Sequence, residues 1–339
     1  MADVAKAAGV SKNAVSLALR NSPQIPETTR DRIRAVANRL GYVRNPVVSE
    51  LFSQMLKSAS SPHRATIGMI NMNKDPKAFT RHPTIPTYVA GCRERARELG
   101  YSLDDFWLHD PEISGRRLLQ ILNTRNVRGL LLIGLMKENR IPKHFGPIIE
   151  HFPCVVTGLR THDPALPFVC VDHHRLSLTA IEQALSLGYQ RPGLVLDPVI
   201  DELIEGRFSA GFLMGQQSLP KRRRLPPLYT TEAGADPPQA FLDWFERHQP
   251  DVIFSLYNNV RHWIEELGLS IPEQAGLIQL EWRADRPDWA GMNQHNDIAG
   301  KTAIDMLISR IHHGERGAPA FPTGTLIGAS WVEGKTARK

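Results

Sequence analysis

The sequence lacks several features that would define its class at once. It has three cysteines among 339 residues, and Cys92, Cys154 and Cys170 stand singly, without a CxxC pair. Disulfide frameworks and cysteine-based zinc sites need several cysteines at set spacings, so we expect three buried, reduced thiols. No apolar run approaches the roughly 20 residues of a membrane span, and the first residues lack a secretion-signal pattern. These absences favour a cytoplasmic protein with no membrane partner.

Motifs of catalysis are missing as well. Two Gly-Lys-Thr triplets are present, but His295 and Ala329 stand where a G-x-x-x-x-G-K-[ST] phosphate loop has its first glycine. Neither pair of adjacent histidines has metal-ligand spacing, since neighbouring residues on a helix point apart. There is no GxSxG nucleophile motif. The sequence therefore predicts no enzyme, no metal site and no cofactor.

Positive charge is concentrated at the start of the chain. The chain carries 41 Lys and Arg against 35 Asp and Glu, a net charge of +6. Residues 1–64 hold ten of the basic and four of the acidic residues, so the remainder holds 31 of each sign. Basic charge confined to a small unit is typical of a module that binds a polyanion, although a solvated basic surface would give the same count.

This basic segment opens with the pattern of three short helices. Helices are expected over residues 1–8 and 12–20, with Gly9 in the turn between them and Ser11 as the N-cap of the second helix. A third helix ends at Gly41. The apolar residues at helical spacing are Val4, Ala5, Ala8, Val15, Ala18, Leu19, Ile33, Val36, Ala37 and Leu40. This arrangement is typical of a helix-turn-helix unit, which lays its second helix in the DNA major groove; a generic helical hairpin is the alternative.

The segment resembles the headpiece of the lactose-repressor (LacI/GalR) family of bacterial transcription regulators. DVAKAAGVS, AVSLAL and ETTRDRIRAVANRLGYVRNP carry the resemblance, which runs without gaps over 1–45 and implies a DNA-binding domain there. It also implies that the residues after the capping serine read base edges, where lysine can donate to guanine and asparagine can pair with adenine. The implied headpiece contacts to double-stranded DNA are Ser11, Lys12, Asn13, Ser16, Leu17, Arg20 and Asn45.

A short helix and linker are expected over residues 46–62. Asn45 and Pro46 favour a helix start, and the SASSP stretch at the end of this segment reads as a linker. The family has a hinge helix at this place, which orders on DNA and inserts a leucine into the minor groove. The resemblance therefore implies DNA contacts by Val48 and Leu51. A plain amphipathic linker helix is the alternative.

From residue 65 onward, apolar runs alternate with amphipathic helical segments. This alternation predicts parallel sheets with crossover helices, and two successive rounds of it predict two similar α/β lobes. A ligand site is expected between the lobes, near the carboxyl ends of the strands. The predicted fold class is thus an all-α helix-turn-helix headpiece followed by an α/β core of two parallel-sheet lobes.

This portion also resembles the effector core of the same family, which shares the periplasmic sugar-binding fold. VRGLLLIG, PCVVTGL, VDHHRLSLTAIEQALSLGY, LGLSIPEQAGLIQL and MNQHNDIAGKTAIDMLISRI carry this resemblance. It implies an effector-binding and dimerisation core over 63–339 that crosses between lobes near residues 160, 291 and 324. Lobe one would then be 65–159 with 292–323, and lobe two 160–291 with 324–339.

The resemblance further implies a site for a small-molecule effector, a sugar or sugar derivative. The implied effector contacts are Tyr88, Trp107, Arg207, Asn258, Glu281 and Trp282. A planar arginine side chain suits bidentate contacts to hydroxyl groups or to a carboxylate. Tyr88 and Trp107 are placed to stack on a ring, although packing in a core would explain each aromatic side chain equally well.

These patterns together predict a ligand-responsive, sequence-specific DNA-binding transcription regulator. We expect a repressor that binds a near-palindromic operator as a homodimer. Two other classes remain open, namely a sugar-sensing or solute-binding protein without DNA function and an α/β sugar enzyme. The basic headpiece argues against the first class, and the missing acid–base or nucleophile constellation argues against the second.

Overall fold

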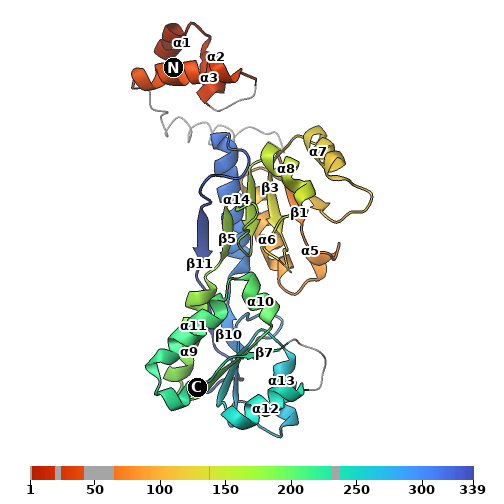
Figure 1. Ribbon diagram of the computed structural model, residues 1–339, viewed down its shortest axis with the longest axis vertical. Helices are drawn as coiled ribbons and strands as arrows, with labels where there is room; N and C mark the ends of the chain where they lie inside the picture. Colours follow the sequence, from red (N-terminus) through yellow and green to blue (C-terminus); the bar gives the residue numbers. More distant parts are fainter. Residues whose placement is uncertain (1, 20–23, 42–64, 137, 231–236) are drawn as a thin grey trace.

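The computed structural model forms a three-helix headpiece and a core of two α/β lobes (Figure 1). It describes residues 2–19, 24–41, 65–136, 138–230 and 237–339. The fold class predicted from the alternation of strands and helices is confirmed. Within the described ranges, the helices are too short or too polar to cross a membrane.

The headpiece has its own small core. Its helices are α1 (Ala2–Ala8), α2 (Lys12–Leu19) and α3 (Glu27–Arg39). Val15, Ala18 and Ile33 are completely buried where the three helices meet. Gly9 joins α1 to α2 with a φ of +63°, a left-handed angle that favours glycine. Helical spacing of apolar residues was therefore sufficient to predict this packing.

One predicted core position of the headpiece is wrong. Leu40 is 48% exposed, although helical spacing places it on the apolar stripe of α3. The reason is that α3 ends at Arg39, so Leu40 is the C-cap residue and no longer follows the helical path. Gly41 follows with a φ of +62° and completes the turn away from the helix.

The first lobe is built on a six-stranded parallel sheet in the order β11-β5-β4-β3-β1-β2. Its strands are β1 (Thr66–Asn71), β2 (Ser102–Trp107), β3 (Val127–Ile133), β4 (Cys154–Thr157), β5 (Phe168–Val171) and β11 (Gly324–Ile327). On β3, Leu130 and Leu132 join one hydrophobic cluster, whereas Leu131 and Ile133 join the other. Because successive strand residues face opposite sides, this continuous apolar run is buried by helices on both faces.

Helices cover both faces of the first sheet. One face packs against α7 (Gly115–Thr124) and α8 (Gly146–His151), and the other against α5 (Ala78–Arg81), α6 (Ile85–Glu98) and α14 (Asn296–His313). Glycines let α6 and α14 approach closely. A Cβ on Gly91 would lie 2.0 Å from the main-chain oxygen of Asp297, and one on Gly300 would lie 2.2 Å from that of Tyr88. This crossing therefore fixes the position of Tyr88.

The second lobe has a six-stranded sheet in the order β12-β10-β9-β8-β6-β7. Its strands are β6 (Pro192–Leu196), β7 (Leu228–Tyr229), β8 (Val252–Ser255), β9 (Gly276–Gln279), β10 (Ala290–Asn293) and β12 (Ser330–Val332). All neighbouring strands are parallel except β12, which runs antiparallel to β10. One antiparallel edge strand on a parallel sheet is a common variation of this architecture.

Helices also cover both faces of the second sheet. One face packs against α9 (His173–Ser186) and α11 (Arg207–Gly215), and the other against α12 (Gln239–His248) and α13 (Asn259–Glu266). Short helical turns complete the core: Lys143–Phe145, Gln216–Ser218 and Lys221–Arg223. A further helix, α10 (Pro198–Leu203), places Leu203 in the hydrophobic core of the first lobe. The two lobes therefore share apolar as well as polar contacts.

The chain crosses between the lobes later than the sequence predicted. The expected crossing near residue 160 is wrong, because β5 still pairs with β4 and β11 in the first sheet. The expected crossings near 291 and 324 also come too early, since β10 remains in the second sheet and β11 in the first. An apolar strand looks alike in either lobe, and only its pairing partners decide which sheet it joins.

The three cysteines are free and buried, as the sequence predicted. Burial raises the pKa of the Cys92 and Cys154 thiols to about 12 and that of Cys170 to about 11. Each thiol is therefore protonated at neutral pH and has little reactivity as a nucleophile.

Candidate functional site

The headpiece presents the start of α2 to solvent. Ser11 Oγ accepts a hydrogen bond from Ala14 N at 3.1 Å, which caps the helix. Ser11 and Lys12 are exposed and Leu17 is half-buried, whereas Val15 lies in the core of the headpiece. The inner face of α2 therefore holds the helix in place, while Ser11 and Lys12 remain accessible to a partner.

The other predicted DNA contacts fall into two groups. Asn13 and Ser16 belong to α2. The rest, together with the predicted hinge helix over 46–62, lie outside the described residues: Arg20, Asn45, Val48 and Leu51. Lys12 is a predicted base reader with a positive charge, and the structure shows that its side chain is exposed.

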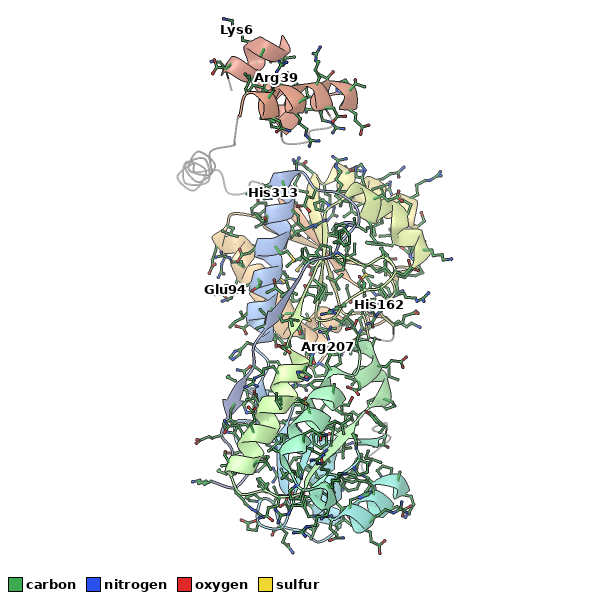
Figure 2. The ribbon with its side chains drawn as sticks, turned by 60° about the vertical axis from the view of Figure 1, so that its left-hand side comes forward. Lys6, Arg39, Glu94, His162, Arg207 and His313 are labelled. Carbon is green, nitrogen blue, oxygen red and sulfur yellow. The ribbon has the colours of Figure 1, made fainter. Side chains whose placement is uncertain are left out.

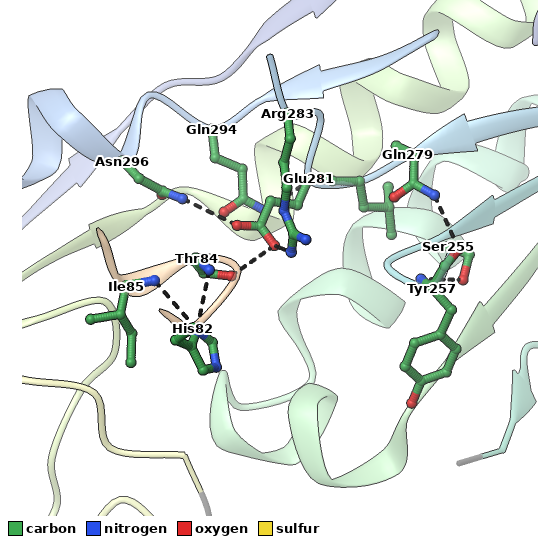
Figure 3. Close-up of polar contacts among 11 residues, drawn as sticks. His82, Thr84, Ile85, Ser255, Tyr257, Gln279, Glu281, Arg283, Gln294 and Asn296 are labelled. Carbon is green, nitrogen blue, oxygen red and sulfur yellow. Dashed lines mark hydrogen bonds and ion pairs between the residues drawn. The ribbon is translucent and has the colours of Figure 1, made fainter. Parts of the chain in front are cut away.

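A carboxylate joins the two lobes of the core (Figure 3). Glu281 comes after β9 of the second lobe, and its side chain is only 11% exposed. Its Oε2 accepts hydrogen bonds from Thr84 Oγ1 of the first lobe at 3.0 Å and from Arg283 Nη2 at 2.8 Å. Asn296 Nδ2, at the start of α14, donates to Oε1 at 3.4 Å. The carboxylate thus ties two helices of the first lobe to the second sheet.

A histidine holds the turn from which Thr84 reaches Glu281. His82 Nδ1 accepts hydrogen bonds from Thr84 N at 3.1 Å and from Ile85 N at 3.3 Å. Burial lowers the pKa of His82, and the negative charge of Glu281 partly opposes this effect. Because Nδ1 is the acceptor, the neutral ring carries its proton on Nε2. His82 therefore orients the beginning of α6 toward the second lobe.

A second polar cluster lies at the first crossing between the lobes. Glu205 Oε2 is 3.5 Å from Arg160 Nη1 and 2.5 Å from Arg207 Nη2, and its Oε1 is 3.5 Å from His162 Nε2. Arg160 and His162 lie between β4 and β5 of the first lobe, whereas Glu205 and Arg207 lie at the start of α11 in the second. Figure 2 shows His162 and Arg207 at the level where the lobes meet.

A small cavity adjoins this cluster. Its volume is about 10 Å³, which is room for roughly one water molecule. Its walls come from both lobes and include Gly158, Arg160, Cys170, His173, Glu205 and Arg207. The guanidinium carbon of Arg160 lies 4.8 Å from the centre of the Phe168 ring, which helps to hold its charge at the cavity.

His173 forms part of the cavity wall and is the first residue of α9. It is 6% exposed, and its ring packs edge-to-face on Phe208 with 4.8 Å between the ring centres. Burial, assisted by the positive charge of Arg207, lowers the pKa of His173 to about 3. The imidazole is therefore neutral at pH 7, when it can still donate one hydrogen bond.

Tyr88 lies between the two clusters. A Cβ on Gly158, which lines the cavity, would be 3.9 Å from the Tyr88 hydroxyl. Burial raises the pKa of Tyr88, and the negative charge of Glu281 raises it further, so the phenol stays protonated. The Glu281 cluster, Tyr88 and the cavity thus follow one another along the junction of the lobes.

Unpartnered polar atoms are concentrated at this junction. Within the described part of the chain, eight buried side-chain nitrogen or oxygen atoms have no hydrogen-bond partner. Six of them belong to the two clusters, to the cavity wall or to residues next to these: Thr157 Oγ1, Arg160 Nε, His173 Nδ1, Trp282 Nε1, Arg283 Nε and Asn296 Oδ1. Because buried polar groups are rarely left unpaired, this concentration is typical of a region that receives a polar ligand.

Several of the predicted effector contacts come together at the junction. Tyr88, Arg207 and Glu281 all lie there, and Trp282 is next to Glu281. Trp107 ends β2, where its indole N–H donates to the main-chain oxygen of Asn73 at 2.9 Å rather than to this region.

Asn258 lies at the same edge of the second sheet as Glu281. It precedes α13 as the N-cap residue, but its side chain makes no capping hydrogen bond. The neighbouring Tyr257 accepts a hydrogen bond at its main-chain oxygen from Gln279 Nε2 at 3.0 Å (Figure 3). Asn258 thus shares an edge with the Glu281 cluster but has no contact that joins it to Tyr88 or Arg207 among the described residues.

The sequence did not single out the residues that complete the junction: His82, Thr84, Arg160, His173, Glu205 and Arg283. Arg160 and His173 follow the carboxyl ends of β4 and β5 closely, so the rule that ligands bind at such ends could have found them. His82 and Glu205 are further from their strands and carried no such signal. Among the residues that the structure describes, no group of three or more His, Cys, Asp or Glu could hold a metal ion.

The headpiece matches a family of known proteins. Residues 1–45 match the model of bacterial regulatory proteins of the lacI family. Over these residues the chain has the headpiece of the lacI family. This match explains the three-helix unit at the start of the chain.

Curated relatives of the chain are transcription regulators. The HTH-type transcriptional regulator MalR of Streptococcus pneumoniae serotype 4 is 26% identical over 189 residues, which are 56% of this chain and 54% of MalR. The chain thus spans about half the length of MalR in this match. The HTH-type transcriptional repressor PurR of Klebsiella pneumoniae is 24% identical over 327 residues, which are 91% of this chain and 89% of PurR.

Solved structures of other transcription regulators have a similar fold. A complex of the transcriptional regulator CelR with cellobiose is 18% identical, with a TM-score of 0.61 and 98% of each chain covered. A lac repressor dimer bound to operator and the anti-inducer ONPF is 18% identical, with a TM-score of 0.60, 99% of this chain and 98% of that chain covered. At this identity the likeness shows the fold.

Proposed function

We propose that this LacI-family protein is a ligand-responsive transcription repressor that binds a near-palindromic operator as a homodimer. One observation carries the DNA-binding part. Helix α2 is capped by Ser11, packed into the headpiece through Val15, and exposed at Lys12. A helix held in this way fits the major groove and presents its first residues to the edges of the bases.

The distribution of charge supports the same assignment. The net charge of residues 1–64 is +6, the same as that of the whole chain, and basic residues attract the phosphates of DNA. The proposed division is a DNA-binding unit over 1–45, a hinge over 46–62 and a core over 63–339. Such a regulator acts in the cytoplasm, where its operator is accessible.

The proposed effector is a sugar or sugar derivative bound between the lobes. Unpartnered polar atoms at the junction and the positions of Tyr88, Arg207 and Glu281 support a polar ligand there. CelR, which has a similar fold, is in complex with cellobiose, and the similar lac repressor is a dimer on its operator. Asn258, Trp282 and Trp107 remain proposed contacts, although the indole N–H of Trp107 already donates to Asn73.

The contacts between the lobes give the ligand a way to act on DNA binding. Thr84 with Glu281, and Arg160 with Glu205, both cross the junction, so a ligand that changes them would change the relative position of the lobes. In a dimer, such a movement alters the spacing of the two hinge segments. The resulting coupling between ligand and DNA is typically about 1–3 kcal/mol.

Selection of bound sequences from random duplex DNA, with the full chain, tests the DNA-binding part. We expect a near-palindromic sequence to be enriched. Lys12→Ala should relax the preference for one base pair in each half-site by about 1–3 kcal/mol, because a base-edge contact is lost. Arg32→Ala is the matched control, since it removes an exposed positive charge from α3 and should leave the preference intact.

The same experiment distinguishes the proposed regulator from the alternative function. A sugar-sensing protein without DNA function would enrich no sequence in any variant, while its core would still bind a ligand. Folded protein that enriches nothing at low salt, with or without added sugars, would contradict the proposed regulator. Sedimentation of the protein on a selected duplex then measures whether two copies bind each site, as the homodimer requires.

A further inference from the structure

Arginines from two different lobes share one carboxylate at the junction. Arg160 of the first lobe and Arg207 of the second both pair with Glu205 Oε2, beside a cavity of about 10 Å³. We propose that the ligand bears a carboxylate, and that this group replaces the Glu205 carboxylate between Arg160 and Arg207. The inference rests on the proposed ligand-responsive function and specifies its ligand as a sugar acid rather than a neutral sugar.

The charges around the cavity favour an anion. Arg160 and Arg207 contribute two positive charges and Glu205 one negative charge, whereas His173 and the Cys170 thiol are neutral at pH 7. When the Glu205 side chain leaves, two positive charges remain without a counter-charge in the cavity wall. A ligand carboxylate restores the balance, because its negative charge can pair with both guanidinium groups as Glu205 Oε2 does.

Asp172, which directly precedes His173 of the cavity wall, is an acid that is already engaged. Its Oδ1 accepts a hydrogen bond from Arg175 N at 3.0 Å as the N-cap of α9. Asp172 also influences the pKa of His173 and of Cys170, but burial is the larger cause in both cases. The acid is therefore no substitute for Glu205 as the partner of the two arginines.

Hydrogen-bond donors converge on the same place. Arg160 Nε and His173 Nδ1 are buried without partners, and His173 is 6% exposed. Helices α9 and α11 both begin at the cavity, with His173 and Arg207 as their first residues. The positive ends of two helix dipoles and these unpartnered atoms are the components of an anion site.

Glu205 has the properties of a replaceable occupant. Its side chain is 30% exposed, so the carboxylate has a route to solvent. Its φ is +62° and that of Gly206 is +68°, so two consecutive left-handed residues aim the carboxylate at the arginines. A left-handed angle is uncommon for a residue with a side chain. Because the cavity holds about one water molecule, a ligand gains its space only when Glu205 moves outward.

Chemical rescue tests the carboxylate site without knowledge of the ligand. The full-length Glu205→Ala variant is heated in sodium acetate or sodium gluconate and in sodium chloride at equal ionic strength. We expect the carboxylate salts to raise its Tm by about 2–4 °C more than chloride does. Adding Arg207→Gln to this variant should abolish the difference. Glu182→Ala, which removes a surface partner of Arg175, is the control and should show no such difference. Equal Tm values in all salts would overturn the proposal.

Calorimetry with matched ligands tests the sugar acid. The probes are gluconate with glucose, and galacturonate with galactose and with the methyl ester of galacturonate. We expect at least one acid to bind about tenfold tighter than its neutral counterparts, because the neutral compounds lack the charge–charge contact with the arginines. Glu205→Gln should tighten binding of that acid several-fold more than it tightens binding of the neutral sugars.

The outcomes distinguish this inference from the proposed function. Neutral sugars that bind as tightly as the acids, or a Glu205→Gln variant that binds the acid no better, would overturn the carboxylate ligand and leave a sugar-responsive regulator in place. Rescue of Glu205→Ala by acetate with no binding of any sugar acid would overturn the sugar part of the inference. Failure of DNA selection with clear binding of an acid would instead contradict the proposed regulator.

Discussion

Thr84 of the first lobe donates a hydrogen bond to Glu281 of the second, with 3.0 Å between Oγ1 and Oε2. Glu281 also accepts from Arg283 and Asn296, so one mostly buried carboxylate holds three partners. Glu281→Ala leaves these buried and half-buried donors without their acceptor, and we expect it to lower the free energy of unfolding by about 1–3 kcal/mol. Thr84→Ala removes one donor and should lower it by only about 0.5–1.5 kcal/mol. Urea denaturation measures both, and equal losses would contradict the central role of Glu281.

Gly300 permits the close crossing of α14 with α6 at Tyr88. A Cβ there would lie 2.2 Å from the main-chain oxygen of Tyr88, so Gly300→Ala must separate the helices. Such overpacking typically costs about 1–3 kcal/mol. Gly146→Ala is the matched control, since a Cβ at Gly146 meets nothing within 4 Å. Thermal unfolding should show a lower Tm for Gly300→Ala alone; an unchanged Tm would mean that the helices can shift freely.

His173 makes the core sensitive to acid. Its pKa is lowered by burial to about 3 in the folded chain, below the ordinary value of 6.5. The unfolded chain therefore binds the proton first, so stability is full above pH 6.5 and falls as the pH drops toward 3. The loss amounts to at most about 1.4 kcal/mol per pH unit for one proton. Denaturation at several pH values should show a shallower loss for His173→Gln, and the exposed His313→Gln should behave as the unaltered chain.

Ser11 caps the helix that carries the proposed base reader. Ser11→Ala removes the acceptor of the Ala14 N–H, and we expect it to destabilise the headpiece by about 1 kcal/mol. Hydrogen exchange of the amides in α2 should report the change, while amides in the buried strands of the core should exchange as before. Ser11→Asp restores an acceptor and should recover the protection of the α2 amides from exchange. Unchanged exchange of these amides in Ser11→Ala would show that the cap contributes little.

Much of the fold follows from local patterns in the sequence. Val15 and Ala18 are buried as helical spacing predicts, and Gly9 adopts the left-handed angle expected of its turn. The alternation of apolar runs with amphipathic helices correctly gave two parallel-sheet lobes. Local patterns failed where a helix ended, as at Leu40, because the end of a helix breaks the spacing on which the prediction depends.

The candidate site, in contrast to the fold, could be predicted only in part from the sequence. Resemblance to the family pointed to Tyr88, Arg207 and Glu281, which the structure places at one junction. Their partners Arg160 and Glu205 were missed, because nothing near them in the sequence indicates that they meet. The crossing near residue 160 was misplaced for the same reason, since β5 could have joined either sheet until its pairing was known.

The sequence by itself determined the basic headpiece, the order of helices and strands, and the repetition that makes two lobes. These properties depend on spacing, capping and charge over one or two turns of chain. Only the tertiary structure decided that Thr84 meets Glu281, at a separation of 197 positions, and that Arg160 and Arg207 share Glu205. Such contacts arise when strands choose their sheet and the lobes close on each other, and that choice depends on packing between distant segments rather than on any local pattern.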